Sequence, residues 1–274
     1  MIAWNLPVLM YHDIVSNGFD LSCSGREMSD ACLLREDMFS RHVKEIARLD
    51  MDTLGFREVG LRRKSSSPVV VTFDDGMLGN YEFAAPVLAE LRMRGIFFVS
   101  TGLIDSPGYM SWSNLEDLTR CGMEVHSHGI SHRPLRSASS SVIRSELEGS
   151  KKILEDRLGV GVCGFSWPHG SYSRRGLDIA LELGYRVICT SDVKTNAPDA
   201  IEGSSCVLGR VDVTSNMGLR DFSLLLEGDR SNWASLRLRW GVKHLVKRCI
   251  GERAYRFLYR RYYGVRRVDL VLDS

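Results

Sequence analysis

The chain has 274 residues, of which 44% are hydrophobic and 26% are charged, a composition that excludes an intrinsically disordered protein. The net charge of +2 conceals an asymmetry, because residues 229–274 contain twelve Lys or Arg and only four Asp or Glu. The rest of the chain is net acidic. We therefore predict one domain over residues 1–228, large enough to be a catalytic domain, and a basic, helical extension over residues 229–274.

The amino-terminal segment MIAWNLPVLMYHDIV has no basic residue before its apolar stretch and no small-residue cleavage site. It therefore predicts a first strand, not a signal peptide. No apolar run approaches the ~18 residues of a membrane-spanning helix. The seven cysteines include no Cys-x-x-Cys pair, which favours reduced thiols over a disulfide framework. We expect a cytoplasmic protein.

Short β-rich runs alternate with helical patterns along the chain. The runs are PVLMYH (7–12), PVVVTF (68–73), GIFFVS (95–100), MEVHS (123–127), VCGFSW (162–167), YRVICT (185–190) and VLGRVDV (207–213). Near-continuous apolar runs are typical of parallel strands buried on both faces. Helical spacing is clearest over residues 80–94 and 139–158, the second ending at Gly159. The alternation predicts an α/β fold, most simply a seven-stranded β/α barrel.

Polar residues of catalytic type follow several of these runs. They are His12 and Asp13, Asp74 and Asp75, His126, His128 and His132, and His169. In β/α barrels, the working residues lie at the carboxyl ends of the strands. We therefore expect these side chains to meet at one end of the barrel.

The adjacent carboxylates Asp74 and Asp75 leave their strand toward opposite sides, so we expect them to have different tasks. One can bind a cation while the other transfers a proton. The alternative is a strand-to-helix turn capped by an Asp.

The histidines at 128 and 132 stand four residues apart and can converge on one ion. With a carboxylate from another strand end they form a His₂Asp set that leaves metal positions open for water and substrate. The alternative is a pair of histidines on a polar loop.

Three segments resemble the motifs of the polysaccharide deacetylase family, the NodB homology domain. They are VVVTFDDG (69–76), MEVHSHGISHRPL (123–135) and FSWPHGSYS (165–173). Similarity continues between them, as in NYEFAAPVL and GIFFVSTGLI, and covers residues 7–228. The resemblance implies a distorted (β/α)7-type barrel.

The resemblance also implies a role for each motif residue. Asp75, His128 and His132 match the family's metal triad, which usually holds Zn²⁺, and Asp74 matches the general base. PVLMYHDI resembles a branch of the family in which the general acid is a histidine on the first strand, here His12.

The sequence departs from the family at two motif positions. Gly129 replaces the usual Ser or Thr between the metal-binding histidines. Ser166 replaces an Arg that orients the base, and we expect Arg210 to supply that charge from a neighbouring strand. Substrate contacts are expected from Tyr11, Trp167, Pro168, His169, Gly170 and Tyr172.

The function implied is metal-dependent hydrolysis of an N-acyl group, most often N-acetyl, from an N-acylated saccharide. Two alternatives are a related amidase or deformylase acting on a non-acetyl C–N bond, and a non-catalytic glycan-binding domain. The retained Asp74, Asp75, His128 and His132 favour an enzyme.

The basic extension shows a helical apolar face over residues 233–250, followed by an Arg- and Tyr-rich segment. A basic amphipathic helix over residues 233–267 could lie on an anionic membrane, which would place the protein peripherally at the inner membrane face. The alternative is that its apolar side packs on the barrel. No fold motif suggests nucleic-acid binding.

Overall fold

The computed structural model describes residues 6–19, 32–57, 67–197 and 204–250. Its strands are β1 (Val8–Tyr11), β2 (Asp13–Val15), β3 (Leu33–Arg35), β4 (Asp52–Thr53), β5 (Pro68–Phe73), β6 (Ile96–Val99), β7 (Glu124–Ser127), β8 (Gly164–Ser166), β9 (Val187–Cys189), β10 (Cys206–Leu208) and β11 (Val211–Asp212). Its α-helices are α1 (Glu36–Arg48), α2 (Ala85–Glu90), α3 (Trp112–Arg120), α4 (Ser140–Leu158), α5 (Arg174–Glu182), α6 (Leu219–Leu226) and α7 (Arg230–Ile250).

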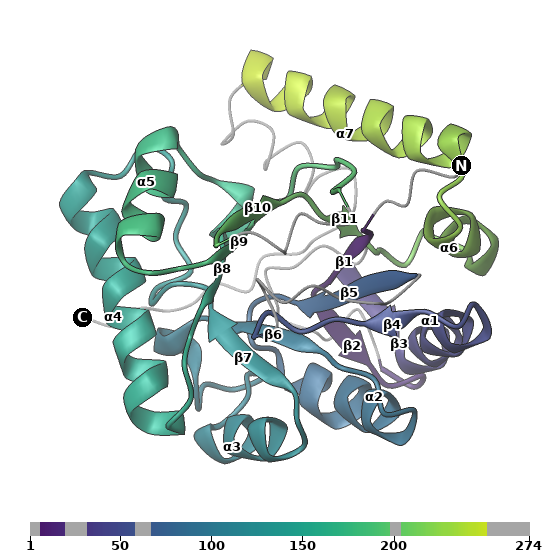
Figure 1. Cartoon of the computed structure of the whole chain (residues 1–274), viewed down its shortest axis with the longest axis horizontal. Helices are drawn as coiled ribbons and strands as arrows, with labels where there is room; N and C mark the ends of the chain where they lie inside the picture. Colours follow the sequence, from purple (N-terminus) through teal and green to yellow (C-terminus); the bar gives the residue numbers. More distant parts are fainter. Residues whose placement is uncertain (1–5, 20–31, 58–66, 198–203, 251–274) are drawn as a thin grey trace.

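The main sheet is parallel and runs in the order β10-β9-β8-β7-β6-β5-β1-β11, with helices α1 to α5 around its outside (Figure 1). The two end strands, β10 and β11, follow one another in the chain and are separated only by Gly209 and Arg210. The sheet therefore curls into a distorted (β/α) barrel, as predicted. The last predicted strand, residues 207–213, is in fact two strands, because the chain turns between its partners β9 and β1.

Residues along each strand alternate between the barrel interior and the surrounding helices. On β5, Val70 packs in the interior cluster, whereas Val69, Val71 and Phe73 belong to the larger cluster beneath the helices. Both clusters are almost fully buried. This double burial explains the continuous apolar runs of the sequence, and it also decides which side chains can enter the barrel.

The predicted helices are present with one change of extent. Helix α4 begins after the capping side chain of Ser139 and ends at Gly159, whose φ of 65° stops the helix as the sequence predicted. The expected helix over residues 80–94 is instead a π-helical turn (Asn80–Ala84) followed by the short α2. Helix α2 ends at Glu90 with Leu91 as its C-cap, and Arg92 has a left-handed backbone conformation with a φ of 55°.

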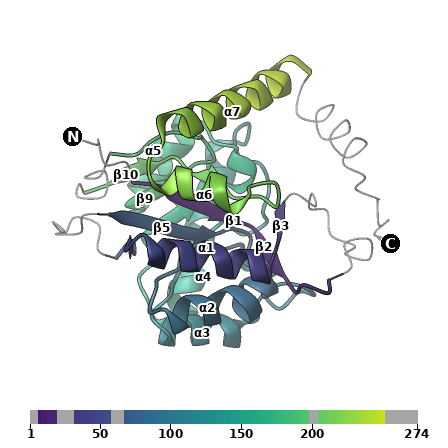
Figure 2. The same ribbon diagram turned by 90° about the vertical axis from the view of Figure 1, so that its right-hand side faces the viewer.

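The basic extension contributes α7, which lies along one side of the barrel above α6 (Figure 2). Residues 251–274, and with them most of the Arg- and Tyr-rich segment, are outside the described residues. No helix in the described residues is long and apolar enough to cross a membrane. The division of the chain at residue 228 stays a prediction.

Gly209 allows the turn that closes the barrel. A Cβ atom at this position would come within 2.5 Å of the Asp192 carbonyl oxygen and 2.2 Å of the Lys194 side chain. We expect Gly209→Ala to lower the free energy of unfolding by about 1–3 kcal/mol, since overpacking forces the backbone to shift. Urea unfolding would measure the loss. Gly161→Ala is the control because its Cβ would meet no atom within 4 Å, and an equal loss in both variants would contradict the argument.

Candidate active site

The three predicted metal ligands meet at the carboxyl ends of β5 and β7. Asp75 Oδ1 lies 3.2 Å from His128 Nε2 and 2.9 Å from His132 Nε2, and one ligand atom of each residue lies within 4.8 Å of the others. Ligands around a zinc ion are about 3 to 4 Å apart, so this donor set fits a divalent metal. In the described part of the chain, no other set of three His, Cys, Asp or Glu side chains converges in this way.

Electrostatics keep the Asp75 carboxylate in its metal-binding form. Burial alone would raise the pKa of Asp75, but hydrogen bonds from the two histidines hold it well below its ordinary value. The carboxylate is therefore ionised. His128 Nδ1 donates to the Ser166 carbonyl oxygen over 2.9 Å, which fixes the ring and leaves its Nε2 free to bind a metal.

Asp75 and His132 reach the site through a backbone conformation that L-residues rarely adopt. Their φ angles are 73° and 54°, and Gly129 between the histidines has a φ of 80°. Strand alternation would send Asp75 away from the barrel, and the left-handed turn returns its carboxylate to the two histidines. The cost of such non-glycine residues, about 1–3 kcal/mol each, is typical of functional sites.

A buried glutamate on α4 holds the histidine loop. Glu146 is 4% exposed and accepts hydrogen bonds from the backbone N–H groups of Ile130 and Ser131 at 2.8 and 2.9 Å. It also accepts bonds from the Ser131 hydroxyl and from Arg133. These contacts fix the loop although Gly129 stands where the family has Ser or Thr, and a Cβ there would lie 3.2 Å from Glu146.

Asp74, the predicted base, lies opposite Arg210 inside the barrel. The two groups form a bidentate ion pair with both N–O distances at 2.7 Å, and the side chains are 5% and 0% exposed. Ser166 donates a further bond of 3.1 Å to Asp74 Oδ2. Burial would raise the pKa of Asp74, but Arg210, together with His128 and His12, lowers it below its ordinary value. Arg210 is thus paired with the predicted base, and its role in orienting that base stays a prediction.

His12, the predicted acid, follows β1 and is one-fifth exposed. Its Nδ1 lies 3.5 Å from Asp212 Oδ1, and Asn80 donates a hydrogen bond of 2.7 Å to its carbonyl oxygen. The ring is close enough to lower the pKa of Asp74 and of Asp75 electrostatically. Burial alone would lower the pKa of His12, but neighbouring acidic groups, Cys32 and Asp212 among them, raise it well above its ordinary value.

The Pro-His-Gly turn after β8 forms one border of the site. His169 is exposed, its ring centre lies 4.6 Å from that of His132, and its φ is 58°. Pro168 is buried and Gly170 partly buried in the same turn. Tyr172 is half-buried and donates a 2.5 Å hydrogen bond to Asp192. Substrate contact by these four residues stays a prediction.

The structure corrects the roles predicted for Tyr11 and Trp167. Both side chains are 1% exposed and pack beneath the outer helices, Tyr11 against Phe39 and Phe73, and Trp167 against Phe165. Strand alternation explains this, because the residues next to them along the chain face the barrel interior, and Tyr11 and Trp167 therefore face the outer helices. Neither side chain is available to a substrate.

His126 is also not beside the metal ligands. It is fully buried within β7, stacks on Phe56, and bonds to Glu124 over 2.9 Å at a deeper level of the barrel.

The important residue that sequence reasoning missed is Glu146. Its only signal was an acidic residue on the otherwise apolar side of the 139–158 helical pattern.

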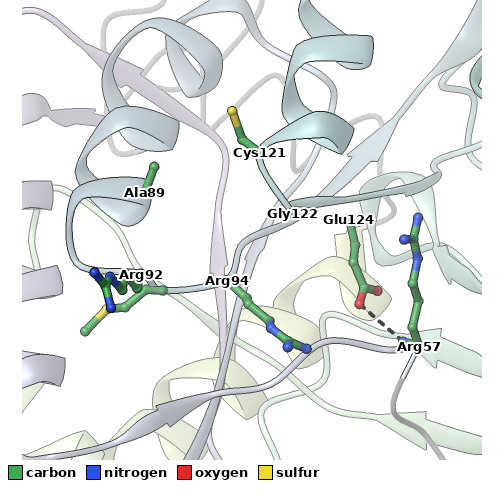
Figure 3. A pocket seen from close by; sticks show the side chains of 8 residues that line it. Arg57, Ala89, Arg92, Arg94, Cys121, Gly122 and Glu124 are labelled. Atoms are coloured by element: carbon green, nitrogen blue, oxygen red, sulfur yellow. Dashed lines mark hydrogen bonds between the residues drawn. The ribbon is translucent and has the colours of Figure 1, made fainter.

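One cavity of about 580 Å³ lies away from this site (Figure 3). It is at the amino end of β6 and β7, whereas the metal ligands are at the carboxyl ends. It is lined by Arg57, Ala89, Arg92, Met93, Arg94, Cys121, Gly122 and Glu124. The backbone N–H groups of Phe56 and Arg57 already bond to the Glu124 carboxylate at its edge.

Comparison with known proteins gives one family. Residues 62–188 match the model of the polysaccharide deacetylase family. YxkH of Bacillus subtilis, provisionally named a polysaccharide deacetylase, is 27% identical over 81% of this chain and 76% of its own length. The chain is thus similar to polysaccharide deacetylases over these residues.

Solved structures agree on the fold. The Streptococcus pyogenes deacetylase PplD, solved with acetate, aligns with a TM-score of 0.70 at 24% identity over 81% of this chain and 96% of that protein. IcaB from Ammonifex degensii aligns with a TM-score of 0.67 at 21% identity over the same shares of the two chains. The distorted barrel is thus shared with both proteins.

With Zn²⁺ as the probe, we expect Glu146→Gln to weaken binding of a divalent metal about 10- to 100-fold, the range found when groups that orient metal ligands are removed. The neutral amide loses the charge-assisted bonds to Ile130, Ser131 and Arg133. Competition with a chromophoric chelator would measure the affinity. Glu148→Gln, an exposed change on the same helix, should bind zinc normally. Unchanged affinity in Glu146→Gln would show that the loop holds its shape without the carboxylate.

Proposed function

We propose that this deacetylase domain hydrolyses an N-acyl group, most often N-acetyl, from a sugar of a glycan or glycan precursor. The observation that supports this most directly is the meeting of three groups of residues at one end of the barrel. Asp75, His128 and His132 form a metal-binding set, Asp74 is ionised, and His12 lies close enough to lower the pKa of both carboxylates.

Asp75, His128 and His132 would hold a divalent metal, which we propose is Zn²⁺. Such an ion supplies Lewis-acid chemistry, polarising the acyl carbonyl group and making water easier to deprotonate. The protein's part is to fix the three donors, which the Ser166 carbonyl and Glu146 do from behind.

Asp74 has the properties required of the general base. Its Oδ2 accepts from both Arg210 and Ser166, whereas its Oδ1 accepts only from Arg210 among the described residues. A carboxylate oxygen has two acceptor positions, so Oδ1 has one left for a water molecule. Arg210 keeps the carboxylate ionised and fixes its orientation. We propose that Oδ1 takes the proton of the attacking water.

His12 has the complementary properties of an acid. Its raised pKa favours the protonated ring, and the carboxylate of Asp212 supports this imidazolium form. A protonated His12 can donate to the departing amine, which needs a proton before the C–N bond can break. A lowered pKa on Asp74 and a raised pKa on His12 therefore predict a base and an acid that are active together across neutral pH.

Asp74→Asn should keep its zinc and lose activity by about 10² to 10⁴-fold, the usual contribution of a general base. Acetate release from N-acetylated oligosaccharides and metal content would be measured on the same sample. Asp75→Asn is the matched comparison and should lose metal as well as activity. Loss of metal in Asp74→Asn would place that residue among the ligands. Release of formate in place of acetate by the parent enzyme would identify a deformylase.

Asp212→Asn should move the alkaline limit of the pH–rate profile to lower pH. The pKa of His12 is raised partly by the Asp212 carboxylate, so removing that charge lowers the pKa, and the acid loses its proton sooner as pH increases. The profile of kcat/KM would show this shift, with the acidic limit unchanged because Asp74 keeps Arg210. An unmoved alkaline limit would assign the acid to another group.

The cytoplasmic location stays a prediction.

A further inference from the structure

We propose that α7 binds the protein to an anionic lipid bilayer through an outward apolar face made of Leu238, Val242, Leu245 and Val246. This surface is separate from the deacetylase chemistry, and the proposal does not depend on the substrate.

The inner side of α7 is fixed on the body of the protein. Trp233 is 3% exposed and donates its indole N–H to the Leu225 carbonyl oxygen of α6 at 3.1 Å. One and two turns further on, Arg237 bonds to Thr195 at 3.1 Å and Trp240 donates to the Ser191 carbonyl oxygen at 2.9 Å. Contacts at the spacing of three to four residues define one helix face, so the opposite face is held away from the barrel.

The opposite side of α7 is aliphatic and exposed. The side chains of Leu238 and Leu245 are 70% and 62% exposed, and Val242 and Val246 are 53% and 39% exposed. The positions recur every three to four residues, so they form one stripe about 12 Å long, given a rise of ~1.5 Å per residue. Other exposed large aliphatic residues in the described chain, such as Leu181 at 42%, are scattered on different elements. A continuous stripe of this kind is typical of a contact surface.

The charge of the extension selects the partner. Residues 229–274 carry twelve basic and four acidic residues, while the rest of the chain is net acidic. Two copies meeting through this face would bring together two α7 helices, each with six Lys or Arg and no Asp or Glu, and the repulsion opposes a dimer. Phosphate groups of a nucleic acid would match the charge but not the aliphatic side chains. An anionic bilayer satisfies both, because acyl chains accept the aliphatic stripe and headgroups accept the basic residues.

The position of α7 brings this surface close to the catalytic end of the barrel. Ser191, which receives the Trp240 bond, follows the carboxyl end of β9, and a Cβ on Gly170 of the Pro-His-Gly turn would lie 2.8 Å from its side chain. A protein lying on a bilayer through α7 would therefore present that rim of its active site near the membrane surface.

Vesicle co-sedimentation of the full chain tests the proposal. The vesicles contain equal amounts of phosphatidylglycerol and phosphatidylcholine, or phosphatidylcholine alone. We expect binding to the anionic vesicles, weakened by added salt, and a loss on the order of 100-fold in partition coefficient for L238S/V242S/L245S, since each side chain contributes burial of apolar surface. The control L181S/L219S/I153S changes exposed aliphatic residues elsewhere and should bind like the parent.

The outcomes separate the possible occupants of the face. Recovery of the parent in the supernatant with anionic vesicles, or unchanged binding by the α7 variant, overturns the proposal. A parent dimer that the α7 variant abolishes, seen by sedimentation velocity without vesicle binding, assigns the face to a second copy. Gain of vesicle binding only after truncation beyond Ile250 assigns it to the chain's own final residues. Hydrolysis of a soluble N-acetylated oligosaccharide should be equal in all variants, so failure of the enzymatic proposal would be seen independently.

Discussion

The ion pair between Asp74 and Arg210 is the constraint on which the rest of the site depends. A carboxylate this deeply buried would take up a proton unless a cation compensated for the lost water, and breaking such a pair typically costs about 3–5 kcal/mol. Arg210 can reach Asp74 only because the chain turns into the barrel between β10 and β11. The irregularity that distorts the barrel is thus the same feature that keeps the base ionised.

Strand register then decides what surrounds the base. Strand β1 lies between β5 and β11, with Met10 opposite both Thr72 and Asp212. His12, two residues further along the same face, is consequently carried toward Asp74 on one side and Asp212 on the other. Parallel pairing therefore brings the base, the proposed acid and its carboxylate together from three distant parts of the sequence. The same pairing sends Tyr11 to the outer core.

Much of this arrangement could be predicted from the sequence because it follows from local patterns. The apolar runs gave the order of the main strands, and their polar ends gave Asp74, Asp75, His128 and His132. The alternation of side chains between the two faces of a strand was also predictable from PVLMYH and VCGFSW. It places Tyr11 and Trp167 on the outer face, and so excludes both as substrate contacts. Short elements such as β2, β3 and β4 gave too little periodicity to be recognised.

Glu146 shows what local patterns could not reveal. Its task is to accept hydrogen bonds from a loop thirteen to sixteen residues earlier in the chain, and that contact exists only once α4 packs beside β7. Helical spacing places Glu146 on the apolar side and Glu148 on the exposed side, but it does not reveal which loop Glu146 contacts. The strained φ angles of Asp75 and His132 are tolerated for the same reason, because packing and hydrogen bonds outside the motif hold them. The motif supplies the metal-binding atoms, but the remainder of the barrel determines where they are.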